Sequence, residues 1–147
     1  MESKGYIYKR KANYYETDCM GIIHHSNYIR YFEEARTEYM YSIGCDIRDM
    51  EKLGVVIPNV DAYARYYKPI KFFDEVEIEV RLTEFTGVRM RLEYIIRFAQ
   101  TGELASKGFT THCFVNDKFK PISMRKAYPE IYNKLKELIV ASEENIN

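Results

Sequence analysis

The chain has 147 residues, of which 46% are hydrophobic and 30% are charged, and its 22 basic residues balance its 22 acidic residues. This length is enough for one domain with a sizeable core, so we expect a single domain over residues 1–147. Proteins that bind nucleic acid through its phosphates normally carry a basic excess. The neutral balance therefore argues against a nucleic-acid partner.

The three cysteines, Cys19, Cys45 and Cys113, form no CxxC pair. An odd, scattered set of cysteines is typical of a reducing compartment. The N-terminal residues lack the apolar core of a signal peptide, and no apolar run approaches the roughly 18 residues that cross a bilayer. We therefore expect a cytoplasmic protein without a membrane span.

The first elements in chain order are a tyrosine-rich strand over 6–15, a short loop and a long helix over 26–43. Apolar residues recur in the helix at a spacing of three and four, which predicts one buried stripe: Tyr28, Ile29, Phe32, Ala35, Tyr39, Met40 and Ile43. Ser26 or Asn27 is the expected cap at its start, and Gly44 suits the left-handed residue that ends a helix.

A short helix is expected over 46–53, followed by an extended segment over 55–67. Polar and apolar residues then alternate with a period of two, which predicts strands over 75–82, 88–98 and 104–115, with turns at Thr86-Gly87 and Thr101-Gly102. Residues 128–141 predict a C-terminal helix with Pro129 in its first turn, and residues 143–147 are expected to fray.

One early helix followed by a run of strands indicates an α+β fold. We expect a curved antiparallel sheet of about five strands wrapped around the long helix, with a second helix at the C-terminus. The outer face of the long helix carries Glu33, Glu34, Arg36 and Glu38, which we expect to be solvated or to form pairs on the helix surface. Tyr28, Phe32 and Tyr39 are expected in the core rather than in a substrate pocket.

Residues with chemical potential gather where the first strand, the loop and the long helix meet. Asp18 and His25 bracket the start of the helix, whose first turn offers N–H groups without internal partners. Gly21 lies between them and is most simply a turn glycine. A carboxylate, an imidazole and free N–H donors are the groups needed to hydrolyse an acyl compound.

Two segments of the chain carry a family resemblance. The run 15–18 (YETD), then Gly21, then the run 24–28 (HHSNY) leading into the long helix, resembles the 4-hydroxybenzoyl-CoA thioesterase family of hot-dog-fold acyl-CoA thioesterases. Residues 66–69 (YYKP) followed by 73–75 (FDE) resemble the second recurrent segment of that family. The resemblance covers about residues 5 to 130.

This resemblance implies a hot-dog fold and hydrolysis of an acyl-CoA thioester to a free acid and coenzyme A. It implies no metal or redox cofactor, and a homodimer or homotetramer with active sites between subunits. Three alternatives remain: a thioesterase acting on acyl carrier protein, a hot-dog dehydratase, and a module that binds acyl thioesters without catalysis. The absence of a hydratase-type His/Asp pair in the helix argues against the dehydratase.

The resemblance also assigns roles to residues around the loop. Asp18 becomes the catalytic carboxylate, either attacking the thioester carbonyl to give an anhydride or activating a water molecule. His25 lies beside the substrate, and the expected binding residues are Gly21, His24, Ser26, Asn27 and Tyr28. Because the two histidines are adjacent, we expect them to point in different directions. The backbone N–H of His25 or of Ser26 is the candidate oxyanion donor.

Basic residues are needed for the phosphates of coenzyme A, and Lys68 and Arg89 are the candidates, with Lys71 and Arg91 as further possibilities. Glu33 and Glu34 are reserve catalytic carboxylates, because a related branch of thioesterases places its carboxylate on the helix. No metal site is expected, since the zinc-type ligands show no ligand spacing: Cys19, His24, His25, His112 and Cys113.

Overall fold

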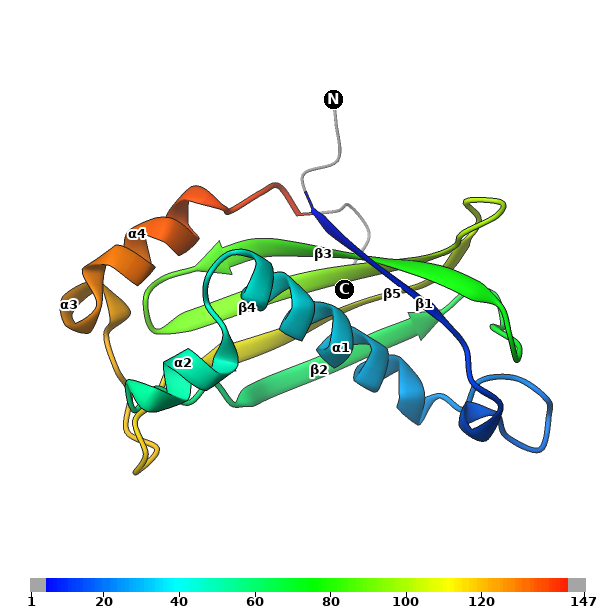
Figure 1. The fold of residues 1–147 in the computed structure, drawn as a ribbon, viewed down its shortest axis with the longest axis horizontal. Helices are drawn as coiled ribbons and strands as arrows, with labels where there is room; N and C mark the ends of the chain where they lie inside the picture. The colour runs from blue at the N-terminus through cyan, green and yellow to red at the C-terminus, as the bar shows by residue number, and fades with distance from the viewer. Residues whose placement is uncertain (1–4, 143–147) are drawn as a thin grey trace.

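The structure, a computed structural model, describes residues 5–142 (Figure 1). The strands are β1 (Tyr6–Lys11), β2 (Asn59–Tyr66), β3 (Glu75–Phe85), β4 (Arg89–Phe98) and β5 (Leu104–Cys113). The helices are a 3₁₀ turn η1 (Tyr14–Glu16) and the α-helices α1 (Ser26–Ser42), α2 (Ile47–Lys52), α3 (Met124–Ala127) and α4 (Pro129–Glu137).

The five strands form one sheet in the order β1-β3-β4-β5-β2, and each neighbouring pair is antiparallel. The sheet curves around α1, which lies across its concave face, while α3 and α4 lie near one end of the sheet (Figure 1). This architecture confirms the predicted α+β, hot-dog fold. No helix within residues 5–142 is long and apolar enough to span a membrane.

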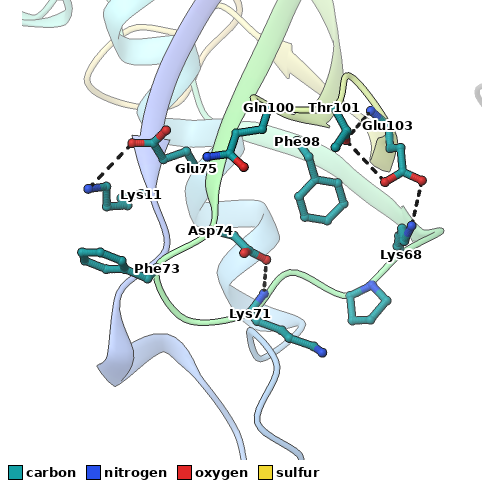
Figure 2. Close-up of a pocket in the computed structure, with 11 residues that line it drawn as sticks. Lys11, Lys68, Lys71, Phe73, Asp74, Glu75, Phe98, Gln100, Thr101 and Glu103 are labelled. Atoms are coloured by element: carbon teal, nitrogen blue, oxygen red, sulfur yellow. Dashed lines mark hydrogen bonds and ion pairs between the residues drawn. The ribbon is translucent and has the colours of Figure 1, made fainter.

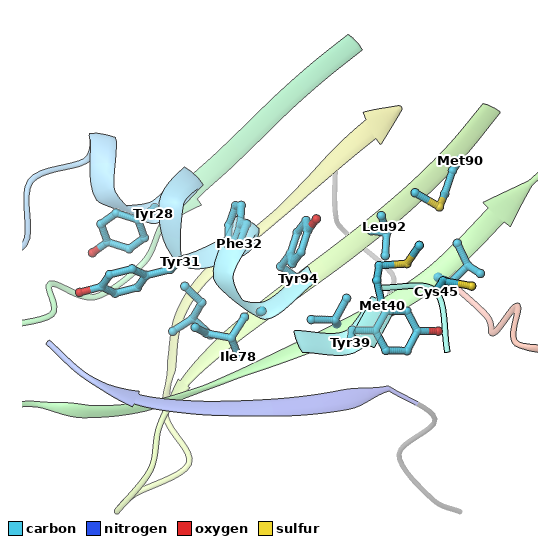
Figure 3. Close-up of a cluster of buried hydrophobic side chains, with 14 of the residues drawn as sticks. Tyr28, Tyr31, Phe32, Tyr39, Met40, Cys45, Ile78, Met90, Leu92 and Tyr94 are labelled. Carbon is cyan, nitrogen blue, oxygen red and sulfur yellow. The ribbon is translucent and has the colours of Figure 1, made fainter. Parts of the chain in front are cut away.

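The core lies between α1 and the sheet (Figure 3). Tyr31, Phe32 and Ala35 from α1 are fully buried, and the ring of Phe32 stacks on that of Tyr94 with centroids 4.4 Å apart. The predicted core positions Phe32 and Tyr39 are confirmed, whereas Tyr28 is buried but also lines the pocket beside Asp18. The predicted stripe omitted Tyr31, although its spacing of three from Tyr28 and four from Ala35 fits the same helical pattern.

Helix α1 ends as the sequence predicted, in a Schellman motif at Gly44. The N–H of Gly44, with φ at 84°, bonds the carbonyl of Tyr41, and the N–H of Cys45 bonds the carbonyl of Met40. A residue with a Cβ is strained at this positive φ, so glycine is the favoured residue. The chain therefore reverses immediately after the helix and leads into α2.

Several predicted elements have different ends in the structure. Strand β2 is shorter than the predicted 55–67, β3 continues past residue 82, and β5 stops before residue 115. The first strand stops at Lys11 rather than at residue 15, because the backbone N–H of Asn13 donates to the Glu16 carboxylate at 2.9 Å and closes the turn η1. The C-terminal helix spans 129–137 rather than 128–141 and is preceded by α3. The predicted fraying of residues 143–147 lies outside the described residues.

Two charged residues on the outer face of α1 are bound to the sheet, whereas the expectation was a solvated face or pairs on the helix surface. The Glu34 carboxylate accepts hydrogen bonds from Arg10 at 2.7 and 2.8 Å and from the Tyr8 hydroxyl at 3.0 Å. Arg36 donates to the hydroxyl of Tyr94 at 3.0 Å. These long side chains reach round the helix to strand residues, which the sequence pattern did not reveal.

A chain of buried polar groups continues from Arg36 into the sheet. The Tyr94 hydroxyl lies 2.6 Å from Oγ1 of Thr110, which lies 2.8 Å from Nε2 of His112. Tyr94, Thr110 and His112 are each no more than 1% exposed. Burial, and then the positive charge of Arg36, lower the pKa of His112 to about 4 from the usual value near 6.5. His112 is therefore neutral at pH 7.

This pKa predicts a loss of stability in mild acid. Between pH 6.5 and pH 4, His112 is protonated in the unfolded chain but not in the folded chain. The contribution of His112 to the free energy of unfolding is therefore highest above pH 6.5 and decreases by about 3 kcal/mol as the pH is lowered to 4. Urea denaturation at pH 7 and pH 4 should show a smaller loss in His112→Phe than in the wild type. Equal losses in the two proteins would contradict the prediction.

Candidate active site

The loop 17–23 is a tight hairpin that fixes Asp18. Thr17 and Ile23 form a β-bridge, and the N–H of Asp18 bonds the carbonyl of Ile22 at 2.9 Å. Gly21 has a φ of 81°, which glycine adopts without strain. Oδ1 of Asp18 accepts from the N–H of Met20 at 2.8 Å and of Ile22 at 3.5 Å. Within residues 5–142, Oδ2 of Asp18 has no hydrogen-bond partner.

The carbonyl of Glu16 ties the loop to the start of α1. It accepts from the N–H of His24 at 2.8 Å and from the side-chain amide of Asn27 at 2.9 Å. On the other side of the loop, the N–H of Ile23 donates to the carbonyl of Ile70 at 2.8 Å. Asn27 therefore anchors the loop. The prediction that Ser26 or Asn27 caps the helix is wrong, because the N-cap position is His25 and its side chain makes no capping hydrogen bond.

The Asn27 tether yields a testable prediction. Asn27→Asp keeps the size of the side chain but turns its buried donor into a charged acceptor facing the Glu16 carbonyl, so we expect unfolding free energy to fall by about 3 kcal/mol. Chemical denaturation at pH 7 measures this loss. The matched change Asn133→Asp, on the exposed face of α4, should be nearly neutral. A similar small effect from both changes would argue against the tether.

The side chain of Glu16 forms a buried network that the sequence analysis missed. Its carboxylate accepts from Arg10 at 2.9 and 3.0 Å and from the Tyr31 hydroxyl at 2.6 Å, and Glu16 is only 5% exposed. The guanidinium of Arg10 also lies 4.0 Å from the centre of the Tyr31 ring. The available signal was Arg10 itself, since an inward-facing arginine on a half-buried strand needs an anionic partner.

One backbone donor at the start of α1 stays free. The N–H groups of Asn27 and Tyr28 bond the carbonyls of His24 and His25, and the N–H of Ser26 bonds Nδ1 of His24 at 3.1 Å. Among the described residues, the N–H of His25 has no partner. Helix α1 also directs the positive end of its dipole toward this position. Of the two predicted oxyanion donors, His25 is therefore the available one.

The two adjacent histidines stack on each other, contrary to the prediction that they point apart. Their ring centroids are 4.2 Å apart and their planes differ by 25°. Nδ1 of His24 lies 2.9 Å from Oγ of Ser26 in addition to accepting the Ser26 N–H. The side chain of His24 therefore bonds both the N–H and the hydroxyl of Ser26 at the start of α1. The exposed ring of His25 stacks on the same His24 ring.

Asp18 and His25 line a common pocket of about 530 Å³, which we call the Asp18 pocket. Its remaining lining residues come from the loop, from α1 and from the end of β2: Met20, Ile22, Ile23, Tyr28, Tyr66, Tyr67, Lys68 and Pro69. The rings of Tyr28 and Tyr66 meet edge to face at 4.7 Å, and burial raises the pKa of Tyr28 to about 12. The pocket thus combines an aromatic wall with a carboxylate.

The structure brings the two segments that carried the family resemblance together at this pocket. Lys71 forms a β-bridge with Ile22, so residues 66–71 run beside the Asp18 loop. Lys68 lies at the boundary with a second pocket of about 520 Å³ and pairs with Glu103 at 2.8 Å (Figure 2). The ammonium of Lys71 has no ion-pair partner within the described part of the chain. Both lysines lie where a phosphate-bearing substrate could reach them.

Arg89 does not lie at the Asp18 pocket of its own chain. It begins β4, pairs with Cys113 and lies beside the turn at Gly87, whereas the Asp18 loop lies by the segment before β3 (Figure 1). A ten-residue strand, about 33 Å long, separates these two ends of the sheet. The sequence pattern placed Arg89 on the right strand but could not tell which end of the sheet it occupies. Arg91, two residues further along, pairs with Glu93.

The predicted metal-type ligands are not clustered. Residues 5–142 contain no group of three or more His, Cys, Asp or Glu side chains in position to hold a metal ion. The reserve carboxylates are also placed: Glu33 is exposed and pairs with Arg36, and Glu34 is bound by Arg10. Neither of them lines the Asp18 pocket.

A curved five-stranded sheet around one long helix, with a carboxylate loop at the helix start, defines a hot-dog thioesterase domain. Residues 13–135 match the Thioesterase-like superfamily, and the chain belongs to this superfamily.

Individual relatives agree with this assignment. The chain is 38% identical to a "Putative esterase" of Aquifex aeolicus, covering 86% of this chain and 96% of the relative. It is 35% identical to the "Putative acyl-CoA thioesterase YneP" of Bacillus subtilis, covering 86% and 94%. The crystal structure of a DHNA-CoA thioesterase from Staphylococcus aureus aligns with a TM-score of 0.85 at 33% identity, covering 90% of this chain and 89% of the other.

Proposed function

We propose that this protein is an acyl-CoA thioesterase that hydrolyses the thioester at the Asp18 pocket. The observation that carries the proposal is the meeting of three groups at one pocket: Oδ2 of Asp18 and the N–H of His25, neither of which has a partner within residues 5–142, and the stacked imidazole of His25. The names of the relatives support a coenzyme A ester as the substrate. Within the superfamily, we place the chain with the 4-hydroxybenzoyl-CoA thioesterase family on the strength of its 15–28 run.

The N–H of His25 polarises the thioester carbonyl in this proposal. Negative charge develops on the carbonyl oxygen as the carbon becomes tetrahedral, and the helix start stabilises that charge. A preorganised donor of this kind is typically worth about a hundred- to a thousandfold in rate. Because its N–H needs no rearrangement to become available, His25 suits this role better than Ser26.

Asp18 brings about the attack on the acyl carbon by one of two routes. As a nucleophile, Oδ2 attacks the acyl carbon, the C–S bond breaks, and water then cleaves the resulting anhydride. As a general base, Oδ2 takes a proton from the water that attacks the acyl carbon. In both routes the thiolate of coenzyme A leaves and takes up a proton, for which the imidazole of His25, at the same pocket, is the candidate donor.

The acyl group and the coenzyme A part of the substrate would use different walls of the pocket. The aromatic wall of Tyr28 and Tyr66 suits an apolar acyl group. Lys68 and Lys71 suit the phosphates of coenzyme A, with the pairing of Lys68 to Glu103 exchanged for a phosphate contact. Arg89 could contribute only from a second copy of the chain, in a homodimer or homotetramer. We assign the protein to the cytoplasm and propose no metal or redox cofactor.

The test is thiol release from a panel of acyl-CoAs with short, medium, long and aromatic acyl groups, followed with a thiol-reactive dye. We expect release from at least one class at a rate well above the uncatalysed reaction. The same acyl groups attached to acyl carrier protein test the alternative that the protein is an acyl-carrier-protein thioesterase. Binding of acyl-CoA without thiol release across the panel would overturn the proposal in favour of a binding module.

A further inference from the structure

A second, smaller cavity lies at the other end of α1 from Asp18. This cavity, which we call the His112 pocket, has a volume of about 240 Å³. Figure 3 shows Met40, Cys45 and Met90 gathered in this region, away from Tyr28. The lining is largely apolar, with a few polar side chains: Glu33, Arg36, Thr37, Met40, Cys45, Ile47, Ile57, Pro58, Asn59, Met90 and His112.

His112 gives this pocket an unused hydrogen-bonding group. The residue is 1% exposed, and within residues 5–142 its Nδ1 is the only buried side-chain nitrogen or oxygen without a hydrogen-bond partner. A buried polar atom of this kind costs about 1–3 kcal/mol when it stays unpaired. Such an atom beside an apolar cavity favours a ligand that pairs with it.

The hydrogen bonds that link Arg36, Tyr94, Thr110 and His112 determine whether Nδ1 of His112 carries the ring proton. Arg36 can only donate, so the Tyr94 oxygen accepts from it. The arrangement in which every hydroxyl proton has a partner then directs the single Tyr94 proton to Thr110. The single Thr110 proton then goes to Nε2 of His112. Because Nε2 accepts and the ring is neutral at pH 7, the ring proton lies on Nδ1. The unpaired atom is therefore an N–H donor.

Acceptors lie near the same donor. The backbone carbonyl groups of Ile57 and Pro58, in the segment before β2, face the His112 ring as hydrogen-bond acceptors and oppose the lowering of its pKa. Within residues 5–142, however, neither reaches Nδ1 with the distance and angle of a full hydrogen bond. A group that both accepts and donates would pair with the ring and with a carbonyl at once. A hydroxyl group has this property, whereas a methyl group, a carboxylate and an ammonium do not.

We propose that the His112 pocket binds a small ring bearing a hydroxyl group, with the hydroxyl oxygen accepting from Nδ1–H of His112 and its proton directed to the Ile57 or Pro58 carbonyl. The size of the pocket supports a ring, because an apolar cavity of about 150 Å³ holds benzene. Met40 and Met90 provide unbranched, polarisable side chains that pack against ring edges and adjust to the occupant.

This site is independent of the proposed thioesterase chemistry. Arg36 follows His25 by eleven residues, or about 16 Å along the helix, so the His112 pocket lies well away from the Asp18 pocket of the same chain. The ring could belong to the acyl group of a substrate held by a second copy of the chain, or to a free small molecule. Direct binding can be measured whether or not the protein hydrolyses acyl-CoAs.

The experiment compares two probes of nearly equal shape, 4-methylphenol and 1,4-dimethylbenzene, by titration followed with NMR. We expect the phenol to bind about five- to tenfold more tightly and to shift the Nδ1 resonance of His112. In His112→Phe, the preference for the phenol should disappear. Should His112→Phe fail to fold, the resonance shift in the wild type still reports the contact.

A matched pair of surface variants tests the location. Thr37 and Glu38 are neighbours on α1 and both are exposed, but only Thr37 lines the pocket. Thr37→Trp should weaken phenol binding at least tenfold by blocking the pocket, and Glu38→Trp should leave it unchanged. Equal affinity for the two probes, or an equal response of the two variants, would overturn the proposal and leave His112 as a core residue only.

The source of the ring can be identified with the same phenol. Competition between 4-methylphenol and an acyl-CoA would identify the ring as part of the acyl group, and simultaneous binding would identify a free small molecule. If the acyl-CoA panel gives no thiol release while the phenol binds as expected, the thioesterase proposal fails and the His112 site stands. If the panel gives thiol release but the phenol does not bind, the thioesterase proposal stands and the His112 proposal fails.

Discussion

Asp18→Asn is expected to lower kcat for acyl-CoA hydrolysis by about 10²–10⁴-fold while the protein stays folded. The asparagine carbonyl can still accept from the N–H of Met20, so the loop is preserved, but the amide can neither attack the thioester nor take a proton from water. The thiol-release assay measures the loss, and circular dichroism with thermal melting checks the fold.

A matched control removes the same charge elsewhere. Asp49→Asn alters an exposed carboxylate on α2 and should retain the wild-type kcat. A folded Asp18→Asn protein with full activity would remove Asp18 from the mechanism. The two routes for Asp18 can also be separated: rapid quenching into hydroxylamine should give a hydroxamate on Asp18 if an anhydride forms, and none if Asp18 acts as a base.

Gly108→Ala is expected to destabilise the protein by at least about 3 kcal/mol. A Cβ at Gly108 would overlap the carbonyl oxygen of Tyr63 on the paired strand and would lie 2.5 Å from Cε2 of Phe32. The strand backbone cannot yield without breaking the β2–β5 pairing, and Phe32 is fully buried against Tyr94. The close approach of α1 to the sheet therefore requires a glycine at this position.

Urea denaturation measures this effect, and Gly102→Ala provides the comparison. Gly102 has a φ of 77° but nothing within 4 Å of an added Cβ, so that change should cost only about 1 kcal/mol of backbone strain. Since small domains have a total stability of about 5–15 kcal/mol, Gly108→Ala could leave a large unfolded fraction. Similar losses from the two changes would show that the helix can move away from β5.

The residue pattern was sufficient for much of the fold. The period of two over 75–82 and the spacing of three and four over 26–43 identified β3 and α1, since local periodicity reports which face of an element is buried. Gly44 was correctly identified as the residue that ends α1, because its positive φ is a local requirement. Asp18 and His25 were singled out by their spacing around the loop and by the family resemblance.

Tertiary structure decided how distant residues combine, because charge pairing and burial depend on contacts between segments far apart in the chain. The Glu16 network joins β1, the loop and α1, and the partner of Arg10 could not be read from its position alone. The same reason explains the far placement of Arg89 and the stacking of His24 on His25.

By itself, the sequence determined the kinds of element, their order and the loop that carries Asp18. Only the packed structure decided that, in the part of the chain that the structure describes, the His25 N–H is the free donor and His112 holds a buried, unpaired nitrogen beside a cavity. Both conclusions concern donors that lack a hydrogen-bond acceptor. A missing hydrogen bond can be recognised only after every nearby donor and acceptor has been placed in space.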